Sequence, residues 1–512
     1  MQRRTFLEFV RAAAMAAVIP NDWRVKLRPS FADTPFTLGV ASGDPTPGEV
    51  TLWTRLATRP LDPDGGMGGS RIAVVWELAD DENFTRVVRQ GRAAAVPELG
   101  HSVHVDLAGL DPDRWFFYRF RAGDALSPVG RTRTAPAAVS DRALRFAAAS
   151  CQHYEQGLFT AYRHLAAEEL DLVFHLGDYI YEYSPIEGRV RKHANSEIMD
   201  LTNYRIRYAQ YKTDPDLSAA HARCPWIVTW DDHEVDNNYA GLIGENVMES
   251  EEQMRARRAA AYQAYWEHQP VRVPRVRTWA DLTIRRSFAW GQLARFWVLD
   301  TRQYRTDQPC GDGLREVPCG DWGSPQHTLL GEPQEAWLTQ GLGSSKAQWQ
   351  VLAQQVMVAP FDELGGTRNR ASMDNWAGYP VARDRLLRTI EQRASNRTVI
   401  LTGDIHSSWV NELKAGFARP GTPTVGAEFV GTSIASGGDG ADRSVAVNDR
   451  TLADNPHLKW QSSRRGYFTC HVAGDRWRTD YRIVPFVSRP DAPITTASSW
   501  QVERGRPGIH PA

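Results

Sequence analysis

The stretch Phe174-His175-Leu176-Gly177-Asp178-Tyr179-Ile180-Tyr181 decides how the rest of the chain is interpreted. The apolar run that leads into it, from Leu172 to Leu176, is typical of a buried β-strand. Gly177 then allows a sharp backbone turn, which leaves Asp178 at the carboxyl end of the strand. Open α/β sheets bind their ligands at that edge. The stretch therefore predicts a functional carboxylate at position 178.

The same pattern recurs further along the chain. The apolar runs 227–230, 296–299 and 399–403 are followed by Asp231-Asp232-His233, by Asp300 and by Asp404-Ile405-His406, respectively. Carboxylates and imidazoles that converge on one rim of a sheet are typical of a site for several metal ions. The alternative is that these aspartates only cap helices or form turns. The repetition favours the metal site.

Length and composition are those of an ordinary globular protein. The 512 residues are enough for two or more domains, and 42% of them are hydrophobic and 24% charged. The net charge of −1 gives no indication of a nucleic-acid-specific binding surface. We expect no stable membrane span.

The N-terminus carries a candidate export signal. Gln2-Arg3-Arg4-Thr5-Phe6-Leu7-Glu8 matches the Arg-Arg-x-Phe-Leu pattern of a bacterial twin-arginine signal, and the apolar stretch 12–20 is too short to cross a bilayer. An amphipathic helix is the alternative, because Glu8 and Arg11 interrupt the pattern. We expect residues 1–32 to be signal and leader, the twin-arginine export machinery to be a partner, and the protein to be periplasmic or extracellular.

The five cysteines cannot all be paired, because their number is odd. Cys310 and Cys319 enclose a short loop, a spacing that suits a local disulfide in an exported protein; two free thiols are the alternative. Such a disulfide is expected to hold the loop, with little effect on chemistry. Cys224 and Cys470 are expected in the core. Cys151 follows an apolar strand-like run and is a candidate thiolate ligand.

The chain divides into two parts with different patterns. From 33 to 138, short alternating apolar stretches separated by Gly, Pro and Asp turns predict a β-sandwich of the immunoglobulin or fibronectin type. From 139 to 512, helical and strand-like segments alternate, which predicts an α/β domain. Residues 251–268 are predicted to form a long helix, whereas 484–512 show no clear periodicity.

Motifs in the same order resemble those of the PhoD-type alkaline phosphatases, a family of the calcineurin-like metallophosphoesterases. They are Ser150-Cys151-Gln152, Gly177-Asp178-Tyr179-Ile180-Tyr181-Glu182, Asp231-Asp232-His233-Glu234-Val235 and Thr402-Gly403-Asp404-Ile405-His406. The resemblance extends from about Phe36 to the C-terminal segment. It implies an αββα metallophosphatase sandwich preceded by the N-terminal β-sandwich. It also implies a C-terminal helix that caps the site, for which 484–512 are the candidate residues.

The resemblance implies Fe3+ and Ca2+ as cofactors, with two calcium ions. The iron ligands of the family carry over to Cys151, Asp178, Tyr181 and His406. The candidates on the calcium side are Asp178, Asp231, Asp232, Asn238 and Asp404. Thiolate, phenolate and imidazole are softer than the oxygen shell that calcium prefers, so the two ligand sets agree with the two metals. Asp178 would bridge them, because one carboxylate can give an oxygen to each.

Several candidates keep an alternative role. Adjacent strand residues point to opposite faces, so we expect only one of Asp231 and Asp232 to dominate. Tyr181 is either a ligand, three positions after Asp178 as in the family, or a packing residue. His233 is a catalytic candidate beside Asp178, as a proton donor to the leaving group or a phosphate contact; the alternative is a structural histidine. Near the site, Asp300 and Arg302 are expected to form a structural ion pair.

We therefore expect a secreted alkaline phosphatase and phosphodiesterase that hydrolyses phosphate mono- and diesters. A metal-bound oxide or hydroxide would attack phosphorus, and the cations would neutralise the transferring group. A phospholipase D-like phosphodiesterase of the same fold is one alternative, although the sequence has no obvious membrane-binding helix. A cell-surface binding module with a structural metal site is the other. Metal-dependent turnover of a chromogenic phosphodiester would separate the module from the enzymes.

Overall fold

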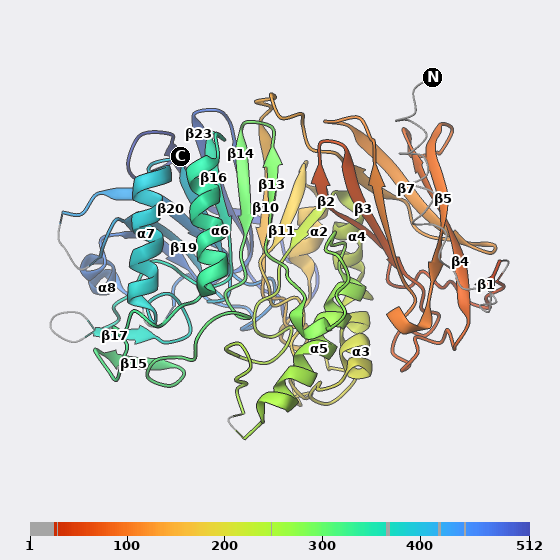
Figure 1. Ribbon diagram of the computed structural model, residues 1–512, viewed down its shortest axis with the longest axis horizontal. Coiled ribbons are helices and arrows are strands. Elements are labelled where there is room, and N and C mark those ends of the chain that lie inside the picture. The colour runs from red at the N-terminus through yellow and green to blue at the C-terminus, as the bar shows by residue number, and fades with distance from the viewer. Residues whose placement is uncertain (1–24, 28, 247, 365–368, 418–420, 445–446) are drawn as a thin grey trace.

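Two large β-sheets packed face to face form the centre of the computed structural model, and helices cover the outer face of each sheet (Figure 1). This is the expected αββα arrangement. The structure describes residues 25–27, 29–246, 248–364, 369–417, 421–444 and 447–512. The twin-arginine pattern at 2–8 and the apolar stretch 12–20 lie outside these ranges. Within them, no helix has both the length and the apolar character that crossing a membrane requires.

The first large sheet has the strand order β25-β24-β23-β22-β10-β11-β12-β2-β3-β6. Its centre is made of three parallel strands, β10 (Leu144–Ala149), β11 (Leu172–His175) and β12 (Trp226–Val228). On one side lie β22 (Arg465–Val472), β23 (Arg476–Val484), β24 (Thr495–Glu503) and β25 (His510–Pro511). On the other side lie β2 (Val40–Thr46), β3 (Glu49–Arg55) and β6 (Ser102–Ala108).

The second large sheet has the strand order β13-β14-β16-β18-β20-β19-β21. Its parallel strands are β14 (Ala294–Val298), β16 (Trp349–Ala353), β18 (Thr398–Thr402) and β20 (Thr424–Val430). The remaining strands are β13 (Arg286–Trp290), β19 (Ser408–Lys414) and β21 (Leu458–Ser462). Phe146 and Phe174 of the first sheet pack against Phe296 of the second, so the apolar strands that precede the predicted site residues form the core between the sheets.

Each helical layer buries its own apolar side. On the first sheet lie α2 (Thr160–Ala167), α3 (Leu201–Lys212), α4 (Pro215–Arg223) and α5 (Glu251–His268). On the second lie α6 (Gly331–Ser344) and α7 (Pro380–Ala394), and a short helix, α8 (Asp449–Asp454), precedes β21. The long helix predicted at 251–268 begins at a capping box, in which Ser250 and Gln253 satisfy each other's backbone N–H groups.

The N-terminal strands form a second, smaller sheet. It contains β1 (Val25–Lys26), β4 (Arg71–Ala79), β5 (Val87–Ala95), β7 (Trp115–Ala122), β8 (Ala125–Leu126) and β9 (Gly130–Arg133). This sheet packs against β2, β3 and β6 through Val50, Leu52, Val74 and Phe120. The opposing layer of this sandwich is therefore the end of the ten-stranded sheet, which β2 joins by pairing with β12 at Gly43 and Trp226.

The C-terminal helix implied by the family resemblance is wrong for this chain. Residues 484–512 are all described, and they form the edge strands β24 and β25 instead of a helix. Pro485, Pro490 and Pro493 interrupt the segment before β24, and proline cannot continue a helix. A capping role for this segment stays a prediction.

The disulfide between Cys310 and Cys319 is confirmed, with the two Cα atoms 6.2 Å apart. It closes a loop that carries β15 (Leu314–Val317), which pairs with β17 (Asn369–Ser372). Cys224 and Cys470 are buried, also as expected.

Candidate metal centre

The parallel strands of both sheets end at one edge of the sandwich, and the candidate residues follow them. In the first sheet Ala149, His175 and Val228 lie side by side in register, and in the second sheet Ala353 lies beside Leu401. The turns after these strands carry all the carboxylate, thiol and imidazole candidates. Among the candidates, the groups close enough to share an ion are Cys151, Asp178 and His406; Asp178, Asp232 and His233; and Asp231, Asp232 and Asp404.

The backbone at these turns is left-handed. The φ angles are 59° at Cys151, 56° at Asp178, 51° at Asn238, 65° at Asp404 and 55° at His406. A residue with a side chain pays roughly 1–3 kcal/mol for such a conformation, which persists only where the surrounding structure enforces it. The concentration of strained positions here supports a functional role for this edge of the sheets.

Two glycines allow the strand ends to approach each other. Gly177 has a φ of 109°, and a Cβ placed on it would lie 2.4 Å from the Cβ of Asp231. A Cβ on Gly403 would lie 2.7 Å from Oγ of Ser150. Both distances are far below a van der Waals contact, so a side chain at either position would push the turns apart.

The first half of the site, which consists of Cys151, Asp178, Tyr181 and His406, combines different types of ligand atom. Tyr181 donates a hydrogen bond to Asp178 Oδ2 over 2.8 Å, and its hydroxyl lies 3.1 Å from Nε2 of His406. Burial, reinforced by the charge of Asp178, raises the pKa of the Cys151 thiol and of the Tyr181 hydroxyl. Neither group would ionise on its own near neutral pH, and a bound cation would provide the missing stabilisation.

The second half is a cluster of carboxylates around one guanidinium. Arg302 is fully buried and lies 2.5 Å from Asp231, 3.2 Å from Asp232, 3.1 Å from Asp404 and 2.7 Å from Asp374. Burial raises the pKa of Asp231 and Asp404 well above the usual range, although Arg302 opposes the shift. Arg305 also pairs with Asp374 over 2.6 Å, but two guanidinium groups cannot balance the four carboxylates, so the donor set fits further cations.

Two buried carboxylate oxygens of this site have no hydrogen bond to any described residue, and the ion pairs of their carboxylates run through the other oxygen. Oδ1 of Asp178 and Oδ2 of Asp231 have no hydrogen-bond partner within the part of the chain that the structure describes. Buried polar atoms are almost always satisfied, and a metal ion at these oxygens would satisfy them. The buried Asp178 therefore fits the bridging role predicted from the sequence.

The structure differs from two expectations about neighbouring residues. Strand β12 ends at Val228, so Asp231 and Asp232 lie in a turn where strand alternation does not apply, and both carboxylates reach the cluster. Asp300 does not pair with the Arg302 guanidinium; its carboxylate accepts the backbone N–H groups of Arg302 and Gln303 over 3.0 and 2.9 Å. Arg302 is thus free to contact the carboxylate cluster.

His233 lies beside the first half of the site and is 8% exposed. Its Nδ1 donates to Oε2 of Glu182 over 2.8 Å. Burial lowers the pKa of His233, but the charges of Glu182, Asp232 and Asp178 outweigh it and raise the pKa well above the ordinary value. These carboxylates therefore favour the protonated form of the ring.

Glu234 has a role that the sequence analysis did not assign. Its buried carboxylate accepts the backbone N–H groups of Asp178, Tyr179 and Asp231 over 3.1, 2.6 and 2.8 Å. It therefore holds the two strand-end turns together. In the sequence, this role is indicated only by the position of Glu234 within the motif Asp231–Val235.

Asn238 approaches the carboxylate half from a separate turn. Its backbone N–H donates to Oδ2 of Asp232 over 2.8 Å, and its side-chain amide donates to Oδ2 of Asp312 over 2.7 Å. This orientation leaves the amide oxygen of Asn238 as the atom that could bind a metal ion. The His406 side chain is 37% exposed, which leaves the site open to solvent on that side.

Comparisons with known proteins agree with this geometry. The model of the PhoD-like phosphatase family matches residues 146–481, and that of the PhoD-like phosphatase N-terminal domain matches residues 22–136. Alkaline phosphatase D of Bacillus subtilis (strain 168) is 49% identical over 493 residues, which are 95% of this chain and 84% of the relative.

Solved structures are similar as well. A structure of PhoD superposes with a TM-score of 0.92 at 49% identity, over 94% of this chain and 93% of that chain. The purple acid phosphatase PPD1 from yellow lupin superposes with a TM-score of 0.57 at 13% identity, over 92% of this chain and 75% of that chain. The second likeness shows the fold alone.

Proposed function

Because the chain belongs to the PhoD-like phosphatase family and is a metal-dependent phosphoric ester hydrolase, we propose that it cleaves phosphate mono- and diesters at a centre of one iron(III) and two calcium ions. The observation that carries the proposal is that the candidate metal ligands separate into two chemically different groups around Asp178. Thiol, phenol and imidazole gather on one side of Asp178, and carboxylates gather on the other. Membership of a phosphatase family decides against a binding module.

The metal ions, when bound, supply an activated nucleophile and positive charge for the phosphoryl oxygens. Cys151, Tyr181 and His406 would hold the iron, together with Asp178. Asp231, Asp232, Asn238 and Asp404 would hold calcium, because their donors are oxygen atoms. Arg302 keeps the carboxylates of Asp231, Asp232 and Asp404 close together before a metal ion arrives.

His233 is proposed to protonate the leaving oxygen. Glu182 fixes Nδ1 of the ring and stabilises the charged form, so the other nitrogen, Nε2, can face the departing group. General acid catalysis of this kind contributes typically 10²–10⁴-fold to a rate. The contribution is largest where the leaving group is a poor one, because such a group needs the proton most.

The test of His233 is the substitution His233→Gln, assayed with two substrates. We expect the rate with an alkyl phosphodiester to fall by roughly 10²-fold or more, and the rate with a nitrophenyl phosphodiester to fall much less. Equal losses with both substrates would show that His233 only contacts the phosphate or supports the loop. Phosphatidylcholine as a third substrate tests for phospholipase D-like specificity.

The test of the bridge is Asp178→Asn. An amide offers one neutral oxygen in place of two anionic ones, so metal content and turnover should both fall by orders of magnitude. Near-native turnover together with native metal content would remove Asp178 from the bridging position.

Export is proposed separately, on the N-terminal pattern. Residues 1–32 would be a twin-arginine signal and leader, followed by the N-terminal sandwich at 33–138 and the phosphatase domain at 139–512. The double substitution Arg3→Lys and Arg4→Lys should leave the precursor in the cytoplasm, because a receptor recognises the arginine pair itself. Unchanged delivery in cell fractionation would point to another route.

A further inference from the structure

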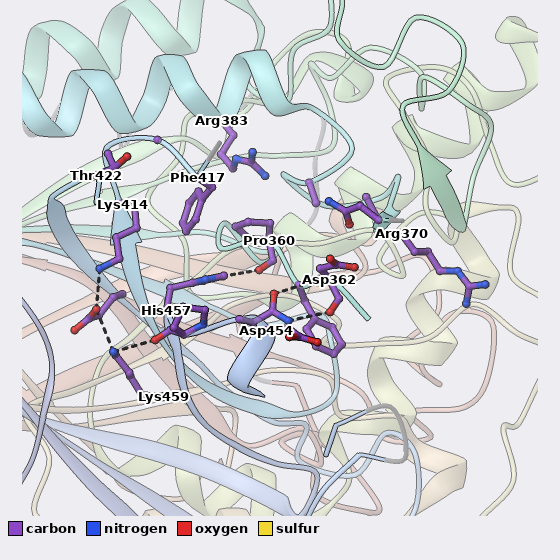
Figure 2. Close-up of a pocket in the computed structure, with 18 of the residues that line it drawn as sticks. Pro360, Asp362, Arg370, Arg383, Lys414, Phe417, Thr422, Asp454, His457 and Lys459 are labelled. Carbon is purple, nitrogen blue, oxygen red and sulfur yellow. Dashed lines mark hydrogen bonds and ion pairs between the residues drawn. The ribbon is translucent and has the colours of Figure 1, made fainter. Parts of the chain in front are cut away.

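A second cavity lies on the helix-covered side of the second sheet. It has a volume of about 810 Å³ and is enclosed by the start of α7, the ends of α8 and β19, and the loop at 360–362 (Figure 2). Among the described residues that line it, none is a candidate metal ligand. A volume of this size accommodates a small organic molecule.

The unusual residue of this cavity is Arg383, in α7. Its side chain is directed from the helix into the cavity, and the residue is only 8% exposed (Figure 2). Its guanidinium donates no hydrogen bond to any residue that the structure describes, and Nε is buried without a hydrogen-bond partner. The nearest carboxylate, that of Asp384, is 3.8 Å from Nε. Burial lowers the pKa of Arg383.

Among the described residues, every other buried arginine donates at least one hydrogen bond from its guanidinium group. Arg302 contacts a set of carboxylates, and Arg207 donates to backbone carbonyl groups of Tyr183, Asn195 and Ser196. A buried cation without hydrogen bonds is costly, because it has lost water and gained no acceptor in exchange. Arg383 therefore lacks the hydrogen-bond acceptors that the fold supplies to its other buried arginines, and its one carboxylate neighbour, Asp384, is distant.

Two other titratable groups of the cavity, Glu412 and His457, do not provide a closer counter-ion for Arg383. Glu412 lies 3.0 Å from Lys414 and 3.2 Å from Lys459, so one carboxylate already serves two ammonium groups. Nε2 of His457 is 2.7 Å from the carbonyl oxygen of Pro360, and burial lowers the pKa of this histidine to about 4, which leaves it neutral. Asp362 and Asp454 also line the cavity, so the part of it that is suited to an anion is the part around Arg383.

Aromatic side chains form the complementary surface. The guanidinium carbon of Arg383 lies 5.4 Å from the ring centre of Phe417, and that ring also packs against His457 with centres 4.9 Å apart. Phe361 and Trp322 line the same cavity. An occupant can therefore place an apolar body on these rings while its charged group reaches Arg383.

We propose that this cavity binds a small organic oxyanion, whose phosphate or carboxylate group pairs with Arg383 and whose apolar part packs on Phe361 and Phe417. The planar guanidinium presents parallel N–H donors that match either oxyanion. The site is separate from the metal centre and does not depend on the proposed reaction.

The test counts binding sites on the metal-loaded enzyme by equilibrium dialysis. The probes are phenylphosphonate, whose carbon–phosphorus bond is not a phosphate ester, and benzoate. We expect phenylphosphonate or benzoate to occupy one more site on the wild type than on Arg383→Met. Arg388→Met, which changes an exposed arginine of the same helix, is the control and should keep the wild-type number. The probe that loses a site identifies the favoured oxyanion.

Arg383→Lys keeps the charge and removes the planar fork, so binding at this site should weaken at least tenfold. This variant also serves if Arg383→Met folds poorly. Thermal unfolding without ligand provides a second measurement: removal of a buried charge that makes no side-chain hydrogen bond should leave the stability of Arg383→Met unchanged or higher. Equal numbers of sites on the wild type, Arg383→Met and Arg383→Lys, with equal affinities, would overturn the proposal.

Discussion

Left-handed backbone is the feature of single residues that defines the metal centre. Cys151, Asp178, Asn238, Asp404 and His406 all adopt it, and each lies in a turn at the edge where the parallel strands end. The conformations are stable because Glu234 accepts N–H groups from two of these turns and because Gly177 and Gly403 permit close contact. The side chains are therefore directed into the site before any metal ion binds.

Gly177→Ala tests this account of the turns. The new Cβ would lie 2.4 Å from Cβ of Asp231, and the φ of 109° disfavours any side chain, so we expect a loss of roughly 3 kcal/mol or more of stability and a loss of metal. The control is Gly188→Ala, because Gly188 also has a positive φ, 77°, but nothing lies within 4 Å of its new Cβ. Thermal unfolding measures the stability of both variants, and metal analysis measures their metal content. Equal effects of the two substitutions would mean that contact with Asp231 is irrelevant.

His175 predicts how the stability of the fold depends on pH. The ring is 1% exposed, and burial together with the charge of Lys212 lowers its pKa from 6.5 to about 3. The unfolded chain therefore binds a proton below pH 6.5 that the folded chain does not. The stabilisation is complete above pH 6.5 and is lost as the pH falls.

Acidification from pH 7 to pH 5 should thus cost the wild type about 2 kcal/mol more than it costs His175→Leu. Denaturant unfolding at several pH values measures this difference, and the comparison cancels the effect of acid on the metal ligands. Parallel pH profiles for the two proteins would contradict a neutral buried His175.

At the level of residues, the sequence predicted the candidate metal ligands better than the residues that hold them in place. Asp178, Asp231, Asp404 and His406 follow apolar strands, and this local pattern is visible in one dimension. Arg302 and Glu234 act through contacts with residues far away in the chain or with backbone N–H groups, and neither kind of contact leaves a local pattern. The turn at Asp231 and Asp232 was mistaken for strand because β12 is short.

At the level of elements, the disulfide loop contributes directly to the site. Asp312 lies inside the ring closed by Cys310 and Cys319, and its carboxylate accepts a hydrogen bond of 2.7 Å from the amide of Asn238. The loop was expected only to be held in place. Its position implies that it also orients a candidate calcium ligand.

Asp312→Ala should therefore weaken calcium binding about tenfold, as the loss of a group that orients a ligand typically does. Asp321→Ala, which changes an exposed aspartate just outside the ring, is the control. Calcium titration of the purified protein measures both, and the double substitution Cys310→Ser and Cys319→Ser should act in the same direction as Asp312→Ala. Unchanged calcium affinity in Asp312→Ala would restrict the loop to a structural role.

Elements were predictable where their apolar pattern was simple. The buried parallel strands and the helix 251–268 have clear patterns and were found. Helix α3 was not assigned, because polar residues such as Arg207, Gln210 and Lys212 are buried in it and obscure the amphipathic period. Strand β24 alternates weakly, since it lies near the edge of the sheet and is partly exposed on both faces.

At the level of the whole molecule, the N-terminal strands and the phosphatase core share one sheet. Strand β2 pairs with β12, and the indole N–H of Trp53 in β3 donates to the carbonyl of Glu267 in α5 over 2.9 Å. The buried Arg133 in β9 pairs with Asp171 at the start of β11. These contacts bury the boundary between the two parts that the sequence separated at residue 138.

We therefore expect the metal-loaded protein to unfold in one cooperative transition. Differential scanning calorimetry should give a single peak, because loss of the N-terminal strands β2 and β3 would expose the edge of β12 and one side of α5. Two well-separated peaks would show that the sandwich and the phosphatase core unfold independently despite the common sheet.

The division of the donor set between two kinds of metal is the central claim, and metal content tests it most directly. The purified protein should be analysed for metals by mass spectrometry, after extensive dialysis against metal-free buffer. We expect close to one iron per chain, with calcium as the other bound metal, because the thiol, phenol and imidazole gather around Asp178 while the oxygen donors lie beyond it. A fully active enzyme that contains zinc or manganese and no iron would contradict the claim, and would return Tyr181 to a packing role.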